Sequence, residues 1–207
     1  MPSLAKLKPL PRSFFNRDPR LVGRELLGKV LLRQEGATLL AGRIVELEVY
    51  LGADDAAAHA ASGQTARNAV LFGPPGHAYV YFIYGNHYCL NVSCMKEGEA
   101  GCLLIRALEP LMGIELMAAN RDLEPTQLRL LASGPGRLSE ALAITRPRDN
   151  GKDLVAATSD LRIVDDGFRP KAVRETLRVG ITKSMELPLR YSIAGSAFIS
   201  GKKLAEE

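Results

Sequence analysis

The arrangement of apolar and polar residues in the first quarter of the chain predicts one short helix and two strands. Asp18 followed by Pro19 is typical of a helix start, and Gly28 predicts where that helix ends. Residues 29–33 and 39–51 then form apolar runs that predict two strands, the second with strict alternation from Ile44 to Tyr50. We therefore expect a helix and then two strands at this end of the chain.

The middle of the chain predicts a β-hairpin and a further buried strand. Aromatic and β-branched runs at 78–84 and 88–94 flank the segment 85–87, whose glycine and asparagine are typical of a hairpin turn. Residues 103–108 predict the next strand, and we expect Pro110 to begin a helix with one apolar stripe. Hairpin and strand together favour an antiparallel sheet.

Loops and further helices fill the remaining segments. The stretch 52–77, rich in Ala, Gly and Pro, is long enough to suggest a functional loop that holds helical turns of its own. Two helices are expected within 123–144, broken by a Gly-Pro-Gly segment, and strands return at 161–166 and 192–200. No repeat, low-complexity tract or linker divides the sequence, so we expect one domain over 1–207.

Composition narrows the class of protein. With 46% hydrophobic and 24% charged residues among 207, the chain has the make-up of an ordinary soluble globular protein. No stretch approaches the ~20 apolar residues of a membrane span, and early prolines and lysines break any signal-peptide core, so we expect a cytoplasmic protein without membrane contact. Cys89, Cys94 and Cys102 form no CxxC pair, which argues against a disulfide framework and predicts reduced, packed thiols.

The distribution of charge favours a polyanionic partner more than the net charge of +4 does. Residues 1–34 carry eight basic against two acidic residues, whereas residues 43–60 carry four acidic residues against one arginine. A basic rim around an acidic centre suits an enzyme that grips phosphates outside and uses carboxylates inside. Ordinary solvated surface charge is the alternative.

The predicted strand at residues 44–50 carries the first candidates for chemistry. Alternation places Glu46, Glu48 and Tyr50 on one face, opposite an apolar face, with the carboxylates roughly 7 Å apart along the strand. Arg106, at the end of an apolar run, is a partner that would keep Glu48 ionised and oriented, as a general base requires. The alternatives are an edge strand with a solvated face, and an arginine that marks the exit of its strand into solvent.

The hairpin adds aromatic candidates. Tyr84 abuts the turn, where a tyrosine is hard to bury, so it can enter the minor groove and replace a base in the stack. Tyr50, Tyr81 and His59 suit the walls of a pocket that sandwiches a flipped base and prefers electron-poor or cationic rings. Asn91 has an amide that can read a base edge. The alternatives are core packing for the tyrosines, a satisfied loop residue for the histidine and an ordinary sheet position for the asparagine.

Other chemical signals are weak. The segment 134–137, Gly-Pro-Gly-Arg, opens a predicted helix whose free amides can hold a phosphate together with Arg137. His87, Cys89 and Cys94 straddle the hairpin without an evident tetrahedral arrangement, so no metal site is expected. No lysine is placed for Schiff-base chemistry, and no Walker loop or GxSxG motif occurs.

Taken together, these segments resemble the alkyladenine DNA glycosylase family, the mammalian-type 3-methyladenine DNA glycosylases, in a bacterial form. The resemblance covers nearly the whole chain and rests on ordered motifs: LPRSFFNRD, GRIVELEVYLG, DDAAAHAASGQTARN, YVYFIYGNHYCLNVSC, LLIRALEPL, LASGPGRL and PLRYSIAGS. It implies an α+β fold: a single compact domain with a curved antiparallel sheet, peripheral helices and a protruding β-hairpin that probes the minor groove. It also implies no metal or organic cofactor, and a monomer whose partner is double-stranded DNA with damaged purines.

The resemblance also implies roles for the candidate residues. Glu48 matches the general base and Arg106 the arginine beside it. Asn91 matches the asparagine that tests the exocyclic edge of a purine and discourages normal guanine. The aromatic residues that match the base-stacking pocket are Tyr50, His59 and Tyr81.

On the DNA-binding side, Tyr84 matches the intercalating wedge. The other positions expected to contact DNA are Thr65, Arg67, Gly85, Asn86 and Arg137. Four positions depart from the family pattern. Leu47 and Val49 replace smaller or polar residues beside Glu48, Asn86 replaces a methionine that commonly follows the glycine of the wedge, and Ala53 replaces a proline after the strand. The last two changes bear on how the hairpin tip stacks and how firmly the pocket loop is held.

We therefore expect a monofunctional DNA glycosylase of base excision repair, which hydrolyses the N-glycosidic bond of alkylated purines flipped from duplex DNA. Lesions of the 3-methyladenine type are the first expected substrates, and hypoxanthine and ethenoadenine are further ones. A rival enzyme is a nuclease that binds Mg²⁺ through Glu46, Glu48, Asp54 and Asp55. A rival without catalysis is a module that senses distorted DNA through Tyr84.

Overall fold

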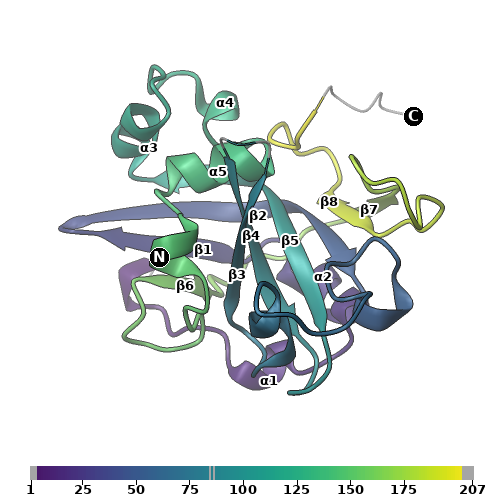
Figure 1. Cartoon of the computed structure of the whole chain (residues 1–207). Coiled ribbons are helices and arrows are strands. Elements are labelled where there is room, and N and C mark those ends of the chain that lie inside the picture. The colour runs from purple at the N-terminus through teal and green to yellow at the C-terminus, as the bar shows by residue number, and fades with distance from the viewer. Residues whose placement is uncertain (1–3, 84, 86, 202–207) are drawn as a thin grey trace.

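An antiparallel sheet organises the protein. The computed structural model describes residues 4–83, 85 and 87–201. Across these residues the sheet has eight strands, and Figure 1 shows helices gathered around its margins. The strands are β1 (Val30–Glu35), β2 (Thr38–Tyr50), β3 (Ala78–Ile83), β4 (His87–Cys94), β5 (Gly101–Met112), β6 (Leu161–Val164), β7 (Val173–Thr176) and β8 (Arg190–Ile193). The expected α+β fold with its β3–β4 hairpin is confirmed.

Strand order places β2 in the interior of the sheet. The order runs β3-β4-β5-β2-β1-β6, and β7 pairs with β8, which itself joins β2. The first part of β2 pairs with β1 and its later part with β8, while β5 covers the other edge. The interpretation of this segment as an edge strand with a solvated face is therefore wrong.

Short helices surround the sheet. They are α1 (Arg12–Phe15), α2 (Pro19–Leu26), α3 (Ile114–Asn120), α4 (Leu128–Ala132), α5 (Pro135–Ala141) and α6 (Arg146–Asp149), with 3-10 turns η1 (Leu4–Lys6), η2 (Gly52–Asp54) and η3 (Ala69–Phe72). Helix α2 begins as expected, because the Asp18 carboxylate accepts a hydrogen bond from the Arg20 N–H at 2.8 Å and Pro19 takes the first helical position. The long loop after β2 holds helical turns, also as expected.

Pro110 does not begin a helix, contrary to expectation. Strand β5 runs on to Met112, and Pro110 stands opposite Gly42 beside a shift in register. Proline is tolerated at such an irregularity because it lacks the N–H that a regular ladder needs. Helix α3 starts at Ile114, after Gly113 has turned the chain with a φ of 72°.

The C-terminal quarter differs from the sequence pattern in two respects. The strand expected over 192–200 ends at Ile193, since Gly195 adopts a left-handed φ of 76° and the chain turns away. Strand β7 was not predicted, because its four residues are half-buried or exposed and carry little apolar signal.

The apolar core lies on one face of β2. Leu26, Leu47, Ile105 and Leu138 belong to a single buried cluster, which α2 and α5 cover. Because successive strand residues point to opposite faces, burial of Leu47 turns Glu48 to the other face. No helix in the described part of the chain is long and apolar enough to cross a membrane.

Candidate active site

A cavity of about 500 Å³ lies on the Glu48 face of the sheet. Its walls come from β2, β3, β4 and β5, from the loop after β2 and from residues 179–183. The residues expected to form the catalytic pair and the base pocket all line it: Glu48, Arg106, Tyr50, His59, Tyr81 and Asn91. The volume falls within the ~300–1,000 Å³ typical of small-molecule sites.

Arg106 bridges the two carboxylates of β2. Its Nε donates to Glu46 Oε1 at 3.0 Å, and its Nη1 lies 3.1 Å from Glu48 Oε1. Burial opposes the charge on Arg106, yet Glu48 and Glu46 outweigh it and raise the pKa of the guanidinium above its ordinary value. The buried Arg106 therefore does not mark the exit of β5 into solvent, and that alternative is wrong.

Glu48 also accepts two neutral hydrogen bonds. The Tyr50 hydroxyl donates to Oε2 at 2.9 Å and the Val179 N–H donates to Oε1 at 2.8 Å. Burial and then the Glu48 charge raise the pKa of Tyr50, so its hydroxyl keeps its proton and remains a donor. The Glu48 side chain has no solvent-accessible surface although it belongs to the cavity lining, because Arg106, Tyr50 and Val179 cover its carboxylate.

Glu46 has a structural role. It accepts hydrogen bonds from Arg190 Nε at 2.7 Å and from the Ser200 hydroxyl at 2.8 Å, in addition to its contact with Arg106. The two arginines and two glutamates balance one another in charge. Glu46 thus fixes Arg106 from the side away from Glu48 and ties the C-terminal segment to the sheet.

Aromatic rings form another part of the cavity lining. His59 and Tyr81 lie edge to face with ring centroids 4.5 Å apart, and the Tyr79 and Tyr81 centroids are 5.7 Å apart. His59 Nδ1 lies 3.0 Å from the Tyr79 hydroxyl. Burial, and then the positive charge of Arg67, lowers the pKa of His59. A neutral imidazole and two phenol rings therefore face the space beside Glu48.

Sequence reasoning missed several lining residues. Tyr79 lines the cavity although no role was predicted for it, and Cys89 and Cys102 were expected only to be packed. Burial raises the pKa of Cys89 to about 11 and that of Cys102 to about 12, so both are neutral thiols, free and buried as expected. The segment 179–183 carries no periodic pattern, and nothing in the sequence pointed to it.

Thr65, Arg67 and Arg137, three of the expected DNA contacts, do not line the cavity. Thr65, Arg67 and Arg137 are exposed, the first two on the loop after β2 and the third in the first turn of α5. Gly85 adopts a left-handed φ of 72°, as a tight hairpin turn requires. Tyr84 and Asn86 lie outside the described residues. Contact with DNA stays a prediction for all of these positions.

Three of the four carboxylates of the rival nuclease hypothesis, Glu46, Glu48 and Asp55, contact arginines, and the fourth, Asp54, is exposed. Glu46 contacts Arg106 and Arg190, and Asp55 contacts Arg178. Within residues 4–83, 85 and 87–201, no three acidic, histidine or cysteine side chains gather as metal ligands would.

Comparison with known proteins gives a consistent result. Residues 13–197 match the model of the family described as Methylpurine-DNA glycosylase (MPG). A protein of Koribacter versatilis is 76% identical over 201 residues, which is 97% of each chain. A Burkholderia cenocepacia protein is 48% identical over 93% of this chain and 91% of its own, and a Methanoculleus marisnigri protein is 46% identical over 92% and 98%. All three carry the name "Putative 3-methyladenine DNA glycosylase". The chain therefore belongs to the methylpurine-DNA glycosylase family.

Proposed function

We propose that this protein, as a DNA N-glycosylase of the 3-methyladenine type, flips an alkylated purine out of duplex DNA and hydrolyses its N-glycosidic bond. The observation that carries the proposal is the Glu48 carboxylate, held by Arg106 at the wall of a cavity that aromatic rings also line. The cavity has the size and lining that a single extruded base requires.

Glu48 is the general base in this proposal. Cleavage of the glycosidic bond passes through oxocarbenium-like charge on the sugar, which a nearby carboxylate stabilises. Glu48 accepts a proton from water as the water oxygen bonds to C1′, and the bond between C1′ and the base nitrogen breaks with its electrons leaving on the base. Arg106 holds the carboxylate in place for that step.

The aromatic wall favours cationic bases. Rings of Tyr50 and Tyr81 attract electron-poor and positively charged heterocycles, and neutral His59 does not repel them. A base such as 3-methyladenine already carries the charge that makes it a good leaving group. Hypoxanthine and ethenoadenine are neutral and need a proton on the ring, so we expect slower release of these bases.

Binding to duplex DNA uses the outer surface. Tyr84 fills the gap left by the flipped base, while exposed Arg67 and Arg137 neutralise phosphates. The protein acts as a monomer in the cytoplasm, where it associates with the nucleoid. The product keeps an intact strand, because water and not an amine attacks C1′. Lys183 lines the cavity and is exposed, so it is the amine that borohydride trapping tests.

The test uses duplexes that each contain one modified purine. Abasic sites are revealed by alkaline cleavage, with and without EDTA, and direct nicking is scored without alkali. We expect alkali-dependent cleavage that EDTA leaves unchanged, and no borohydride-trapped adduct. Loss of activity in EDTA would support the nuclease hypothesis instead, and tight binding to distorted duplexes without base release would support the binding module.

A further inference from the structure

A buried ion pair joins the two loops that flank the cavity. Asp55 follows η2 in the loop after β2, and Arg178 follows β7, 123 residues later in the chain. Arg178 Nη1 and Nη2 donate to the two Asp55 oxygens at 2.5 and 2.9 Å, and neither side chain is exposed. The pair is therefore a two-pronged bridge that solvent does not reach.

Arg178 also contacts the elements that hold Glu48. Its Nη1 donates to the Val49 carbonyl at 3.0 Å and its Nη2 to the Ser184 carbonyl at 3.2 Å. The guanidinium carbon lies 4.7 Å from the centroid of the Tyr50 ring. The next residue, Val179, donates its N–H to Glu48. One side chain thus fixes the ring and the loop that supply both neutral hydrogen bonds to the carboxylate.

Asp55 and Arg178 do not line the cavity themselves. Two buried charges contribute little net stability compared with well-packed apolar residues, because desolvation offsets their attraction. Planar, bidentate geometry, in contrast, restricts orientation strongly. The arrangement is suited to holding Tyr50 and Val179 in place and is poorly explained by stability alone.

We propose that the Asp55–Arg178 pair positions residues for the reaction. It holds the Tyr50 ring and the Val179 amide, which in turn orient the Glu48 carboxylate toward the attacking water and the flipped base. The inference rests on the proposed function. Neither residue touches substrate, so both act through Tyr50 and Val179. A displacement of about 1 Å in such a site can lower a rate by about 10²-fold.

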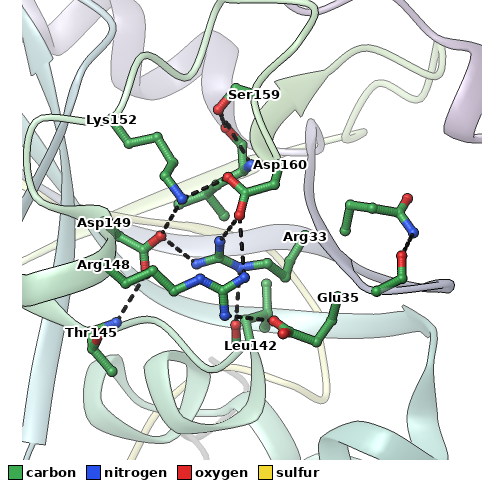
Figure 2. A network of polar contacts seen from close by, with 12 residues as sticks. Arg33, Glu35, Leu142, Thr145, Arg148, Asp149, Lys152, Ser159 and Asp160 are labelled. Carbon is green, nitrogen blue, oxygen red and sulfur yellow. Dashed lines mark hydrogen bonds and ion pairs between the residues drawn. The ribbon is translucent and has the colours of Figure 1, made fainter.

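The chain offers a matched control. Arg33 of β1 and Asp149 of α6 form another ion pair with both side chains unexposed, 2.7 Å apart, within the network of Figure 2. Asp149 also accepts a backbone hydrogen bond, from Thr145, as Asp55 does from Ala57. Neither member of the control pair lines the cavity.

The experiment compares Asp55→Asn with Asp149→Asn at a temperature below the thermal unfolding midpoint of each variant. Single-turnover base release is measured at saturating enzyme, and affinity is measured on a duplex with a stable abasic-site analogue. We expect Asp55→Asn to lose about 10²-fold in rate with affinity close to wild type. We expect Asp149→Asn to lower the unfolding midpoint while its rate stays near wild type. An Asp55→Asn rate no lower than that of Asp149→Asn would overturn the proposal.

Arg178→Lys keeps the charge but not the two-pronged geometry, and serves if Asp55→Asn fails to fold. We expect an intermediate loss of rate, whereas a wild-type rate in this variant would overturn the proposal. Failure of the two proposals can be told apart. A wild-type protein that releases no base refutes the proposed function, while an active wild type with an equally active variant refutes only the positioning role.

Discussion

Replacing Arg106 by methionine tests how the charge on Glu48 is maintained. The substitution preserves much of the side-chain volume but removes the cation that contacts both Glu46 and Glu48. Glu46 keeps its bond to Arg190. Glu48 is left with the hydroxyl of Tyr50 and one backbone N–H, both uncharged. The loss of ionic stabilisation therefore falls mainly on Glu48.

The size of the effect follows from the separation of the charges. Two unit charges about 4 Å apart interact by about 4 kcal/mol at an effective dielectric constant near 20. Since about 1.4 kcal/mol corresponds to a tenfold change in rate, loss of this interaction should slow base release by up to about 10³-fold. Breaking a buried pair also lowers the free energy of unfolding, typically by about 3–5 kcal/mol.

Single-turnover base release at neutral pH measures this loss of rate. Arg106→Lys keeps a positive charge and should lose less of the rate. Arg169→Met, at an exposed arginine paired with Asp165, controls for the loss of one positive charge on the protein. A rate for Arg106→Met equal to that of wild type would refute the electrostatic role of the arginine.

Three further predictions concern the loop and the pocket. The pKa of His59 is lowered from 6.5 in the folded protein, so the unfolded chain binds more protons than the folded protein once the pH falls below about 6.5. Wild type should therefore lose more free energy of unfolding than His59→Phe between pH 7 and pH 5, as measured by urea titration. A Cβ at Gly52 would lie 1.8 Å from the Ala100 carbonyl oxygen at a φ of +78°, so Gly52→Ala should destabilise the fold by more than about 2 kcal/mol in thermal unfolding, whereas Gly36→Ala, with open space around it, should cost less. If Asn91, which lines the cavity, tests the exocyclic edge of the base as we expect, Asn91→Ala should raise excision of 7-methylguanine relative to hypoxanthine in competition assays; an unchanged ratio would contradict that role.

Much of the site could be predicted because it depends on local alternation. The period of two in β2 placed Glu48 and Tyr50 together and Leu47 in the core, and the structure agrees. Arg106 was identifiable because a charge that follows an apolar run requires a partner. The alternation in β2 and the charge in β5 are each local to one strand, so they can be recognised from the sequence alone.

The missing parts depend on contacts between distant segments. Glu48 is interior because β8, more than 140 residues later, pairs with β2. The bridge between Asp55 and Arg178 likewise spans 123 residues, and neither residue carries a periodic signal. Pro110 was misassigned because its tolerance in β5 depends on a register shift with β2, which only the paired strand reveals.

Glu48→Gln tests the central claim most directly. The substitution keeps the shape of the side chain and removes the charge that accepts the proton of water, so base release from a lesion-bearing duplex should fall by at least about 10²-fold. Binding of the same variant to a duplex with an abasic-site analogue should remain close to wild type. A Glu48→Gln protein that releases the base at the wild-type rate would contradict the account.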